Sequence, residues 1–575
     1  MPEAPLPWEE PLGARPLGDG RTAFRVWAPR ASAVTVVRDG GETPLRDVGG
    51  GVFAGEATAS PGDDYRLRVD DGDPLPDPCS RFQPEGVRGP SRIVDPAAWE
   101  WTDAGWPGLD PAALVVYELH VGTFTPEGTF AAVAARLPEL RELGVTAIEL
   151  LPVATFPGER NWGYDGLHTW APHPAYGGPD GLAALVDAAH REGLGVIMDV
   201  VYNHLGPGSE TLEAFGPYLS AKHGTPWGDA VNFDDADCGG VREWAIQNAC
   251  MWVRDLHMDG LRVDAVHAIH DEGARHVLAE LCDRVRAAAH VPPVLIAESD
   301  LNDPRTVTPV ALGGWGFDAQ WADDHHHAVH AHLTGERDGY YGDYAGVAEL
   351  AATARTPFVY DGRWSPFRRR RHGGPADGLP PERFVVCAQN HDQVGNRAVG
   401  DRPPPETRRL AALWTLLSPF TPMIFMGEEY GETRPFQFFT DHIDPFIADA
   451  TRDGRRREFA SFEGFSGEEV PDPQDPATFA RSVLDPGAGD PAVRELYRRL
   501  LAVRAWLPRE RPVVRYDASG WVASRRGAVT VAGNFGDERA EVPVGASELV
   551  LATDDGVTLA GGVLHLPPRT GAVTR

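Results

Sequence analysis

Apolar runs of strand length recur through the middle of the chain, and amphipathic stretches of helical length separate them. The runs are LVVYELHV (114–121), VTAIELLPV (145–153), LGVIMDVVYNH (194–204), GLRVDAVH (260–267), PVLIAES (293–299), FDAQW (317–321), FVVCAQNHD (384–392) and TPMIFMGEEYG (421–431). Between them, FAAVAARLPELRELG and DGLAALVDAAHREG have the pattern of helices, and the second ends at Gly193, a residue type that commonly caps a helix. Strands that are apolar on both faces and alternate with helices are typical of a parallel sheet.

The number of runs distinguishes two arrangements of such a sheet. A doubly wound open sheet and a closed barrel both alternate strands with helices. Eight runs, with polar residues at the end of nearly every one, favour the barrel, because barrel enzymes place their chemistry at the carboxyl ends of the strands. We therefore predict an α/β fold, a (β/α)₈ TIM barrel, over residues 106–505. Two connections, 205–245 and 322–383, are long enough to carry function or extra substructure.

Both ends of the chain show a different pattern. Short alternating runs, FRVWAP, VTVVRD and YRLRVD, lie within residues 24–70, and short runs return after Arg504 as WVASRR, AVTVAGNF, AEVPV, ELVLAT and VLHLPP. Alternation broken by Gly and Asp turns predicts antiparallel sheets. We expect an N-terminal immunoglobulin-like β-sandwich of the carbohydrate-binding kind over 1–105 and a C-terminal β-sandwich over 506–575.

Composition narrows the choice of partners. Hydrophobic residues make up 42% and charged residues 24%, as in ordinary globular proteins. The net charge of −31 repels phosphate backbones and anionic lipids, so no nucleic acid and no membrane is expected as a partner. The five cysteines form no C-x-x-C pair, which argues against disulfides and thiolate metal sites. The first residues lack a signal-peptide pattern and no long apolar run is present, so a cytoplasmic location is expected.

Carboxylates stand at the ends of three predicted strands. Alternation in LRVDAVH puts Arg262 and Asp264 on one face, Glu298 follows the apolar LIA, and Asp392 closes the seventh run. Taken singly, each has a structural interpretation: a buried ion pair, a partner of a barrel arginine, or a polar turn. Burying all three is costly unless they are used or paired, and one arginine cannot neutralise three. Together they predict an active site.

Glycoside hydrolases typically use two such carboxyl groups to cleave their substrate. A retaining mechanism needs them about 5–5.5 Å apart, and adjacent strands can supply that separation. Arg262 is expected to keep Asp264 ionised as the nucleophile, because a nearby cation lowers a carboxyl pKa. Glu298 follows apolar residues and is the better candidate for a raised pKa and hence for the acid. Asp392 would face the oxocarbenium-like transition state.

Four segments in order resemble the signature segments of the α-amylase superfamily, glycoside hydrolase family 13. They are DVVYNH (199–204), GLRVDAVH (260–267), LIAE (295–298) and QNHD (389–392), and the resemblance covers roughly residues 110–500. It implies a retaining α-glucan enzyme with Asp264 as nucleophile, Glu298 as acid/base and Asp392 as transition-state stabiliser.

The loops are similar to those of the maltooligosyltrehalose trehalohydrolases. The similar segments are RNWGYDG (160–166), APHPAYGGPDGL (171–182), GTPWGDAVNF (224–233), AQWADDHHHAVH (319–330) and QNHDQVGNRAVGDR (389–402). This resemblance implies hydrolysis of the α-1,4 bond next to the terminal trehalose of maltooligosyltrehalose, and a partner synthase that makes this substrate. A glucan branching enzyme, or another glucan hydrolase of the superfamily, would share the four signature segments. A non-catalytic carbohydrate-binding relative is less favoured, because such proteins typically lose members of the acidic triad.

The same loops supply candidates for sugar binding. Trp162 and Tyr164 follow the second strand, where an aromatic face can stack on a glucose ring; packing beneath a loop is the alternative. The other candidates for binding the substrate are His204, Arg262, His267, Asp323, Asp324, His325, His326, His391, Gln393 and Asn396. Adjacent residues such as those of the D-D-H-H run rarely converge on one ion, so no metal and no cofactor is expected. Asn203, which matches a calcium-binding asparagine of many α-amylases, is expected to be structural or near the substrate.

Overall fold

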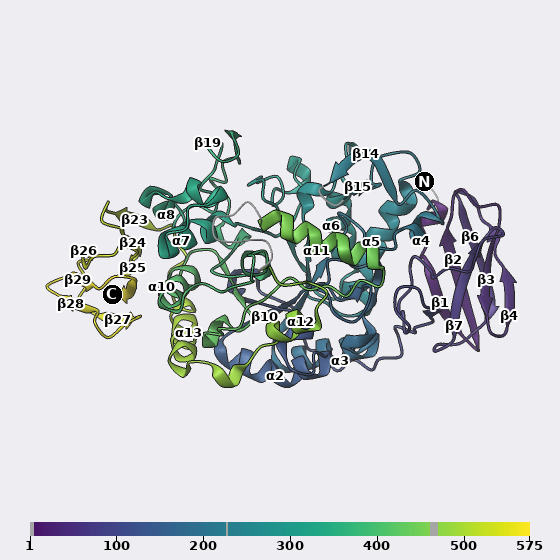
Figure 1. Ribbon diagram of the computed structural model, residues 1–575, viewed down its shortest axis with the longest axis horizontal. Helices are drawn as coiled ribbons and strands as arrows, with labels where there is room; N and C mark the ends of the chain where they lie inside the picture. The colour runs from purple at the N-terminus through teal and green to yellow at the C-terminus, as the bar shows by residue number, and fades with distance from the viewer. Residues whose placement is uncertain (1–4, 226–227, 460–469) are drawn as a thin grey trace.

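The computed structural model describes residues 5–225, 228–459 and 470–575, and its three parts lie in a row (Figure 1). The N-terminal sheets form one end, the barrel lies in the centre and the C-terminal sheets form the other end. Within the described residues, no helix combines the length and the apolar character needed to cross a bilayer. Pro226 and Trp227, part of the GTPWGDAVNF segment, lie outside the described residues.

The central part is a closed barrel of eight parallel strands, which confirms the predicted fold. In space the strands follow the order β10-β13-β16-β17-β18-β21-β22-β9. Their bounds are β9 (Val116–Leu119), β10 (Ala147–Leu150), β13 (Gly195–Val200), β16 (Gly260–Val263), β17 (Val294–Ala297), β18 (Ala319–Trp321), β21 (Phe384–Cys387) and β22 (Thr421–Phe425). Each predicted apolar run contains one of these strands. Because all of them point the same way, the polar residues that follow them meet at one rim.

Helices pack against one another around the barrel, α2 against α3, α5 against α6, and α13 against both α2 and α10. The Thr129 side chain accepts from the Ala132 amide at the start of α2, and Gly193, with φ of 75°, ends α3 as predicted. The helices are α2 (Phe130–Leu143), α3 (Gly178–Glu192), α5 (Gly239–Asp255), α6 (Val277–Ala288), α7 (Asp324–Thr334), α10 (Pro405–Leu416), α11 (Pro445–Phe459), α12 (Pro476–Ser482) and α13 (Pro491–Arg504).

The long connections contain substructure of their own. The chain after β13 holds α4 (Glu210–Glu213) and the hairpin β14 (Leu219–Thr225) and β15 (Gly228–Val231), while the chain after β18 holds α7, α8 (Val347–Ala352), β19 (Trp364–Ser365) and β20 (Arg370–Arg371). Shorter pieces are α1 (Val121–Phe124), the hairpin β11 (Ala154–Thr155) and β12 (His168–Pro172), and α9 (His391–Gly395). These connections surround the rim at which the strands end.

Each flank consists of two antiparallel sheets, which confirms the predicted β-sandwiches. The N-terminal pair is β1-β2-β6-β5 and β4-β3-β7-β8, with bounds β1 (Gly13–Gly18), β2 (Arg21–Trp27), β3 (Val34–Arg38), β4 (Gly41–Pro44), β5 (Arg46–Asp47), β6 (Val52–Thr58), β7 (Asp64–Val69) and β8 (Ser91–Arg92). The C-terminal pair is β23-β24-β25-β30-β27 and β26-β29-β28, with bounds β23 (Val513–Tyr516), β24 (Trp521–Arg526), β25 (Val529–Asn534), β26 (Ala540–Pro543), β27 (Leu549–Ala552), β28 (Thr558–Ala560), β29 (Val563–Leu566) and β30 (Thr570–Thr574).

Candidate active site

Asp264 and Glu298 occupy matching places on neighbouring strands. β16 pairs with β17 in register, Val263 opposite Ala297, so the two acids are the next residues of strands that lie about 4.8 Å apart. The side chain of Asp264 keeps 11% of its area exposed, that of Glu298 13% and that of Asp392 38%. All three carboxyl groups are therefore reachable from the rim of the barrel.

Arg262 is completely buried beneath these acids and contacts three carboxylates. Its Nη1 lies 2.8 Å from Asp199 and 2.8 Å from Asp264 Oδ1, and its Nη2 lies 3.7 Å from Glu298 Oε2. The guanidinium also lies 4.3 Å from the ring centroid of Trp321. One cation cannot balance three buried carboxylates, so at least one of them holds a proton more tightly than it would in water.

Asp264 is held by donors on both of its carboxylate oxygens. Arg262 donates to Oδ1, and Asn203 Nδ2 donates to Oδ2 at 2.6 Å and to the main-chain oxygen of Asp264 at 3.0 Å. These donors fix the orientation of the carboxylate, as a nucleophile requires. Asn203 thus supports Asp264 directly, which is a structural role beside the acid.

Glu298 is the acid that holds its proton. Burial raises its pKa well above the usual value, and Asp264 and Asp392 raise it further against the opposing effect of Arg262. Its Oε2 accepts from the amide of Ala265, which has φ of 40°, a strained region for a residue with a side chain. A carboxyl group whose pKa is raised in this way suits a general acid.

His391 and Asp392 begin α9, and Glu118 of β9 fixes their position. Glu118 accepts from His391 Nδ1 at 2.6 Å and from the His391 amide at 2.9 Å. Burial opposes protonation of His391, but Asp392 and Glu118 outweigh it and raise the pKa to about 9. His391 is therefore an imidazolium at neutral pH, with Nε2 lying 3.5 Å from Asp392 Oδ1.

Tyr164 links this histidine to the buried arginine. Its hydroxyl donates to Asp199 Oδ2 at 2.6 Å and accepts from His391 Nε2 at 2.8 Å, and the two rings stack with centroids 5.1 Å apart. Burial raises the pKa of Asp199 to about 6, although Arg262 opposes this. The half-buried Tyr164 ring is thus fixed at the rim beside the acids.

Replacing Glu118 with glutamine is expected to lower the pKa of His391 from about 9 towards the ordinary value near 6.5. The amide still accepts a hydrogen bond but carries no charge. We expect kcat/KM above pH 7 to fall by roughly tenfold, the scale of losing a partner that orients a functional group. The measurements are an NMR titration of His391 and a pH–rate profile. The exposed Glu127→Gln is the matched control; an unchanged titration in Glu118→Gln would contradict the assigned role.

Several other predicted binding residues also lie around the acids. Asn396 Nδ2 donates to Asp392 Oδ1 at 3.0 Å. Burial, and then Asp392, raise the pKa of the partly buried Asp323 to about 7. The partly exposed His267 lies 3.8 Å from Asp300 across the rim. His204 contacts the main-chain oxygen of Tyr164 at 2.9 Å and so supports the loop that carries the tyrosine.

Trp162 lies beneath the site and not on its surface. It is only 4% exposed, its Nε1 donates to the Gln437 carbonyl at 2.9 Å, and its ring stacks on Phe436 with centroids 5.0 Å apart. This placement matches packing under a loop, the alternative that the sequence left open, and does not support a stacking platform for glucose.

Asp324 and His325 are likewise bound by the protein itself. Asp324 accepts from Asn302 Nδ2 at 2.9 Å, from the Tyr344 hydroxyl at 2.6 Å and from the amides of residues 359 and 360, so it ties together the connection after β18. His325 is 1% exposed and its Nε2 lies 3.2 Å from the hydroxyl of Thr415. Successive residues of a helix point in different directions, which is why the D-D-H-H run does not face the rim as one group.

His326 and Gln393 line a cavity of about 380 Å³ between α7 and α9. His326 stacks against His330 with centroids 5.3 Å apart, and Arg397 closes one wall. Burial, together with His330, lowers the pKa of His326 well below its usual value, so the ring is neutral. Gln393 therefore adjoins Asp392 in the chain but contributes to this neighbouring cavity.

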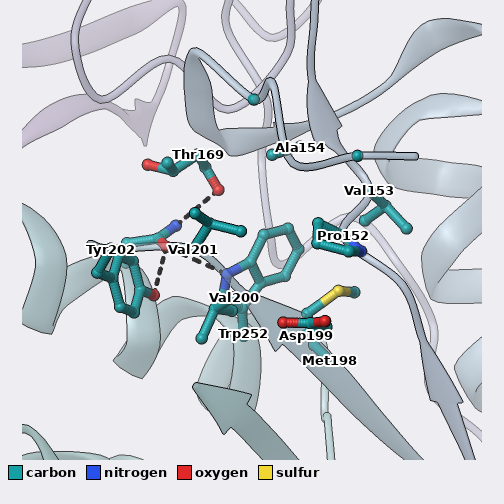
Figure 2. A pocket seen from close by; sticks show the side chains of 13 residues that line it. Pro152, Val153, Ala154, Thr169, Met198, Asp199, Val200, Val201, Tyr202 and Trp252 are labelled. Carbon is teal, nitrogen blue, oxygen red and sulfur yellow. Dashed lines mark hydrogen bonds between the residues drawn. The ribbon is translucent and has the colours of Figure 1, made fainter. Parts of the chain in front are cut away.

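A pocket that Asp199 helps to line is too small for a sugar. Figure 2 shows the side chains around it. Its volume is about 10 Å³, roughly the room that one water needs. Trp252 and Tyr202 border it, and both donate to Asn248 Oδ1, at 3.2 and 2.6 Å. It is a packing gap behind the acids and not a binding site.

Sequence reasoning missed two buried glutamates inside the barrel. Glu118 and Glu149 lie two residues beyond Val116 and Ala147, which belong to the apolar layer that fills the barrel's base, so alternation turns both acids inward. Burial raises the pKa of Glu149 well above its usual value, and neither of its carboxyl oxygens has a hydrogen-bond partner among the described residues. The available signal was a single acid inside each apolar run, VVYELHV and TAIELLPV.

Three family models match successive parts of the chain. Carbohydrate-binding module 48 (isoamylase N-terminal domain) matches residues 11–96, the alpha amylase catalytic domain matches 90–221, and a domain of unknown function, DUF3459, matches 513–573. These matches agree with the N-terminal sandwich, the barrel and the C-terminal sheets.

Curated relatives match over nearly the whole length. A malto-oligosyltrehalose trehalohydrolase from Rhizobium sp. (strain M-11) is 47% identical, over 98% of this chain and 99% of the relative. One from Arthrobacter ramosus is 48% identical, over 96% and 99%. The crystal structure of a candidate alpha amylase from Salmonella typhimurium is 39% identical with a TM-score of 0.90, over 98% of this chain and 99% of that one.

Proposed function

Because this chain belongs to the malto-oligosyltrehalose trehalohydrolase family, we propose that it hydrolyses the α-1,4-glucosidic bond next to the terminal trehalose of maltooligosyltrehalose and releases trehalose. Two relatives that carry this name match over 98% and 96% of this chain, across the barrel and both flanks. The single observation that supports the chemistry is the cluster of Asp264, Glu298 and Asp392 at the rim, with Arg262 buried beneath two of them.

In the first step, Asp264 attacks the anomeric carbon of the glucose on the non-reducing side of the bond. The carbon–oxygen bond to trehalose breaks as Glu298 gives its proton to the departing oxygen, so trehalose leaves as a neutral alcohol. Positive charge develops on the sugar ring meanwhile, and the carboxylate of Asp392 stabilises it electrostatically. A covalent glycosyl ester on Asp264 remains.

In the second step, water replaces trehalose. Glu298, now ionised, takes a proton from this water as its oxygen attacks the anomeric carbon, and the ester bond to Asp264 breaks. The maltooligosaccharide leaves with its original α configuration and both acids return to their starting states. Tyr164 and His391, fixed by Asp199 and Glu118, are proposed to bind sugar hydroxyls beside these groups.

The linkage specificity is tested by comparing products. The purified protein is incubated with a maltooligosyltrehalose and with the maltooligosaccharide of equal length, and the products are separated by chromatography. We expect trehalose as the main early product and much slower cleavage of the plain oligosaccharide. If trehalose is not released, the proposal is wrong; reduced iodine staining of amylose without release of trehalose would indicate a branching enzyme instead.

The proposed substrate implies that another enzyme makes it. Maltooligosyltrehalose carries a trehalose linkage at its end, so a synthase that converts the reducing end of a maltooligosaccharide into that linkage must act first. The carbohydrate-binding module match at residues 11–96 fits a glucan-type substrate for the chain as a whole.

A further inference from the structure

Another cavity lies at the opposite end of the barrel from the acids. Its volume is about 260 Å³. Several of its lining residues directly precede strands, Val115 before β9, Thr146 before β10 and Pro419 shortly before β22. Asp264 and Glu298 follow their strands, so the barrel separates this cavity from the active site.

Three arginines from the barrel's last helix, the linker and the C-terminal sheet line this cavity. Arg504 ends α13, Arg509 is exposed in the linker, and Arg526 ends β24 with only 4% of its area exposed. None of the three forms an ion pair with a carboxylate in the described part of the chain. A buried arginine in a protein of net charge −31 is usually paired.

The two inner arginines donate to main-chain carbonyls instead. Arg504 donates to the carbonyls of Leu416 at 2.8 Å, Ser418 at 3.0 Å and Phe420, and Arg526 donates to those of Leu417 and Pro508. Leu416 is the last residue of α10, and a helix leaves such a carbonyl unpaired at its C-terminus, where the helix dipole amounts to about half a negative charge. Both arginines therefore have a structural role, and these carbonyl groups offset only part of their positive charge.

The charge in the cavity does not balance. Three guanidinium groups face about half a negative charge from α10 and one carboxylate, Glu382, which is exposed at the rim. Burial, with Arg526 and Arg509 nearby, lowers the pKa of Arg504 to about 9, and burial lowers that of Arg526 to about 10. Both groups stay charged at neutral pH, so an excess of more than one positive charge faces the cavity.

We propose that this cavity binds a phosphate group, either as free orthophosphate or as a small phosphomonoester. Arg509 makes no hydrogen bond or ion pair among the described residues, so its planar guanidinium fork can match two phosphate oxygens, while Arg504 and Arg526 add positive charge behind it. The cavity is larger than orthophosphate alone requires, so it has room for a sugar-sized substituent. Because Arg526 belongs to the C-terminal sheet and Arg504 to the barrel, the ligand joins the two parts.

The site is tested by calorimetric titration of the full-length protein with orthophosphate and, separately, with glucose 6-phosphate, at constant ionic strength in chloride. We expect saturable binding of one ligand per chain and a rise in Tm, because a ligand that binds only the folded state stabilises it. Tighter binding of glucose 6-phosphate identifies an ester as the ligand, and tighter binding of orthophosphate identifies the free ion.

Arg509→Gln is the informative variant, because this exposed arginine makes no hydrogen bond or ion pair among the described residues and its loss leaves Arg504 and Arg526 in place. We expect it to weaken phosphate binding at least tenfold, Arg509→Lys to restore part of the affinity, and hydrolysis without phosphate to stay unchanged. Arg511→Gln, an exposed arginine of the same linker, is the matched control. Equal effects of phosphate and chloride on Tm, or equal losses in both glutamine variants, would overturn the proposal.

Discussion

Asp264→Asn is expected to lower kcat by at least about 10⁴-fold, the scale of losing a nucleophile that works with other groups as a unit. The amide keeps the size of the side chain and can still accept from Arg262, so the fold should stay intact. It cannot, however, form the glycosyl ester on which the two-step mechanism depends. The loss is measured with maltooligosyltrehalose by following the release of trehalose, alongside Tm and circular dichroism.

A nearby acid provides the control for this substitution. Asp300, with 54% of its side chain exposed, lies at the same rim, and Asp300→Asn removes the same charge without touching Arg262. We expect it to keep activity within a few-fold of the parent protein. If Asp264→Asn retained near-parental kcat with an intact fold, the assignment of the nucleophile would be wrong.

Glu298→Gln is expected to lower kcat on maltooligosyltrehalose by about 10²–10⁴-fold, the usual contribution of a general acid. Glutamine cannot donate a proton to the departing trehalose oxygen. With an α-glucosyl fluoride, whose leaving group needs no proton, the first step should be much less affected. This difference between substrates separates an acid from a group that is merely structural.

The pH dependence follows from the raised pKa of Glu298. The protonated form is the active acid, so kcat of the parent protein falls as pH rises through this pKa. In Glu298→Gln no proton is lost from this position, and the alkaline limb should disappear. An unchanged alkaline limb in the variant would assign that limb to another group, such as His391 with its pKa of about 9.

The strands were predictable because a parallel barrel requires each of them to be apolar on both faces. Each strand therefore appears in the sequence as a continuous apolar run, and the structure places β16 and β17 inside GLRVDAVH and PVLIAES. The ends of the runs carried the acids for the same reason: a residue just beyond a strand lies at the rim. Asp264, Glu298 and Asp392 could therefore be selected without coordinates.

The contacts between side chains of different barrel strands were not predictable in this way. Glu118 contacts His391 although 273 positions separate them, and Arg262 reaches Asp199 across 63. Only closure of the barrel turns these inward-facing side chains towards a common axis. The same closure decides that Trp162 packs on Phe436 and that Asp324 binds Asn302, whereas their sequence neighbours Tyr164 and Asp323 face the acids.

The sequence by itself determined the number and order of the strands, the flanking sheets and the three acids, since local periodicity and strand ends are properties of short segments. The tertiary structure decided the electrostatics. It put one buried arginine among three carboxylates, so that the pKa of Glu298 is raised while Asp264 is held by Arg262 and Asn203. The pKa of a carboxyl group depends on burial and on charges within a few ångströms, and segments far apart in the chain supply both.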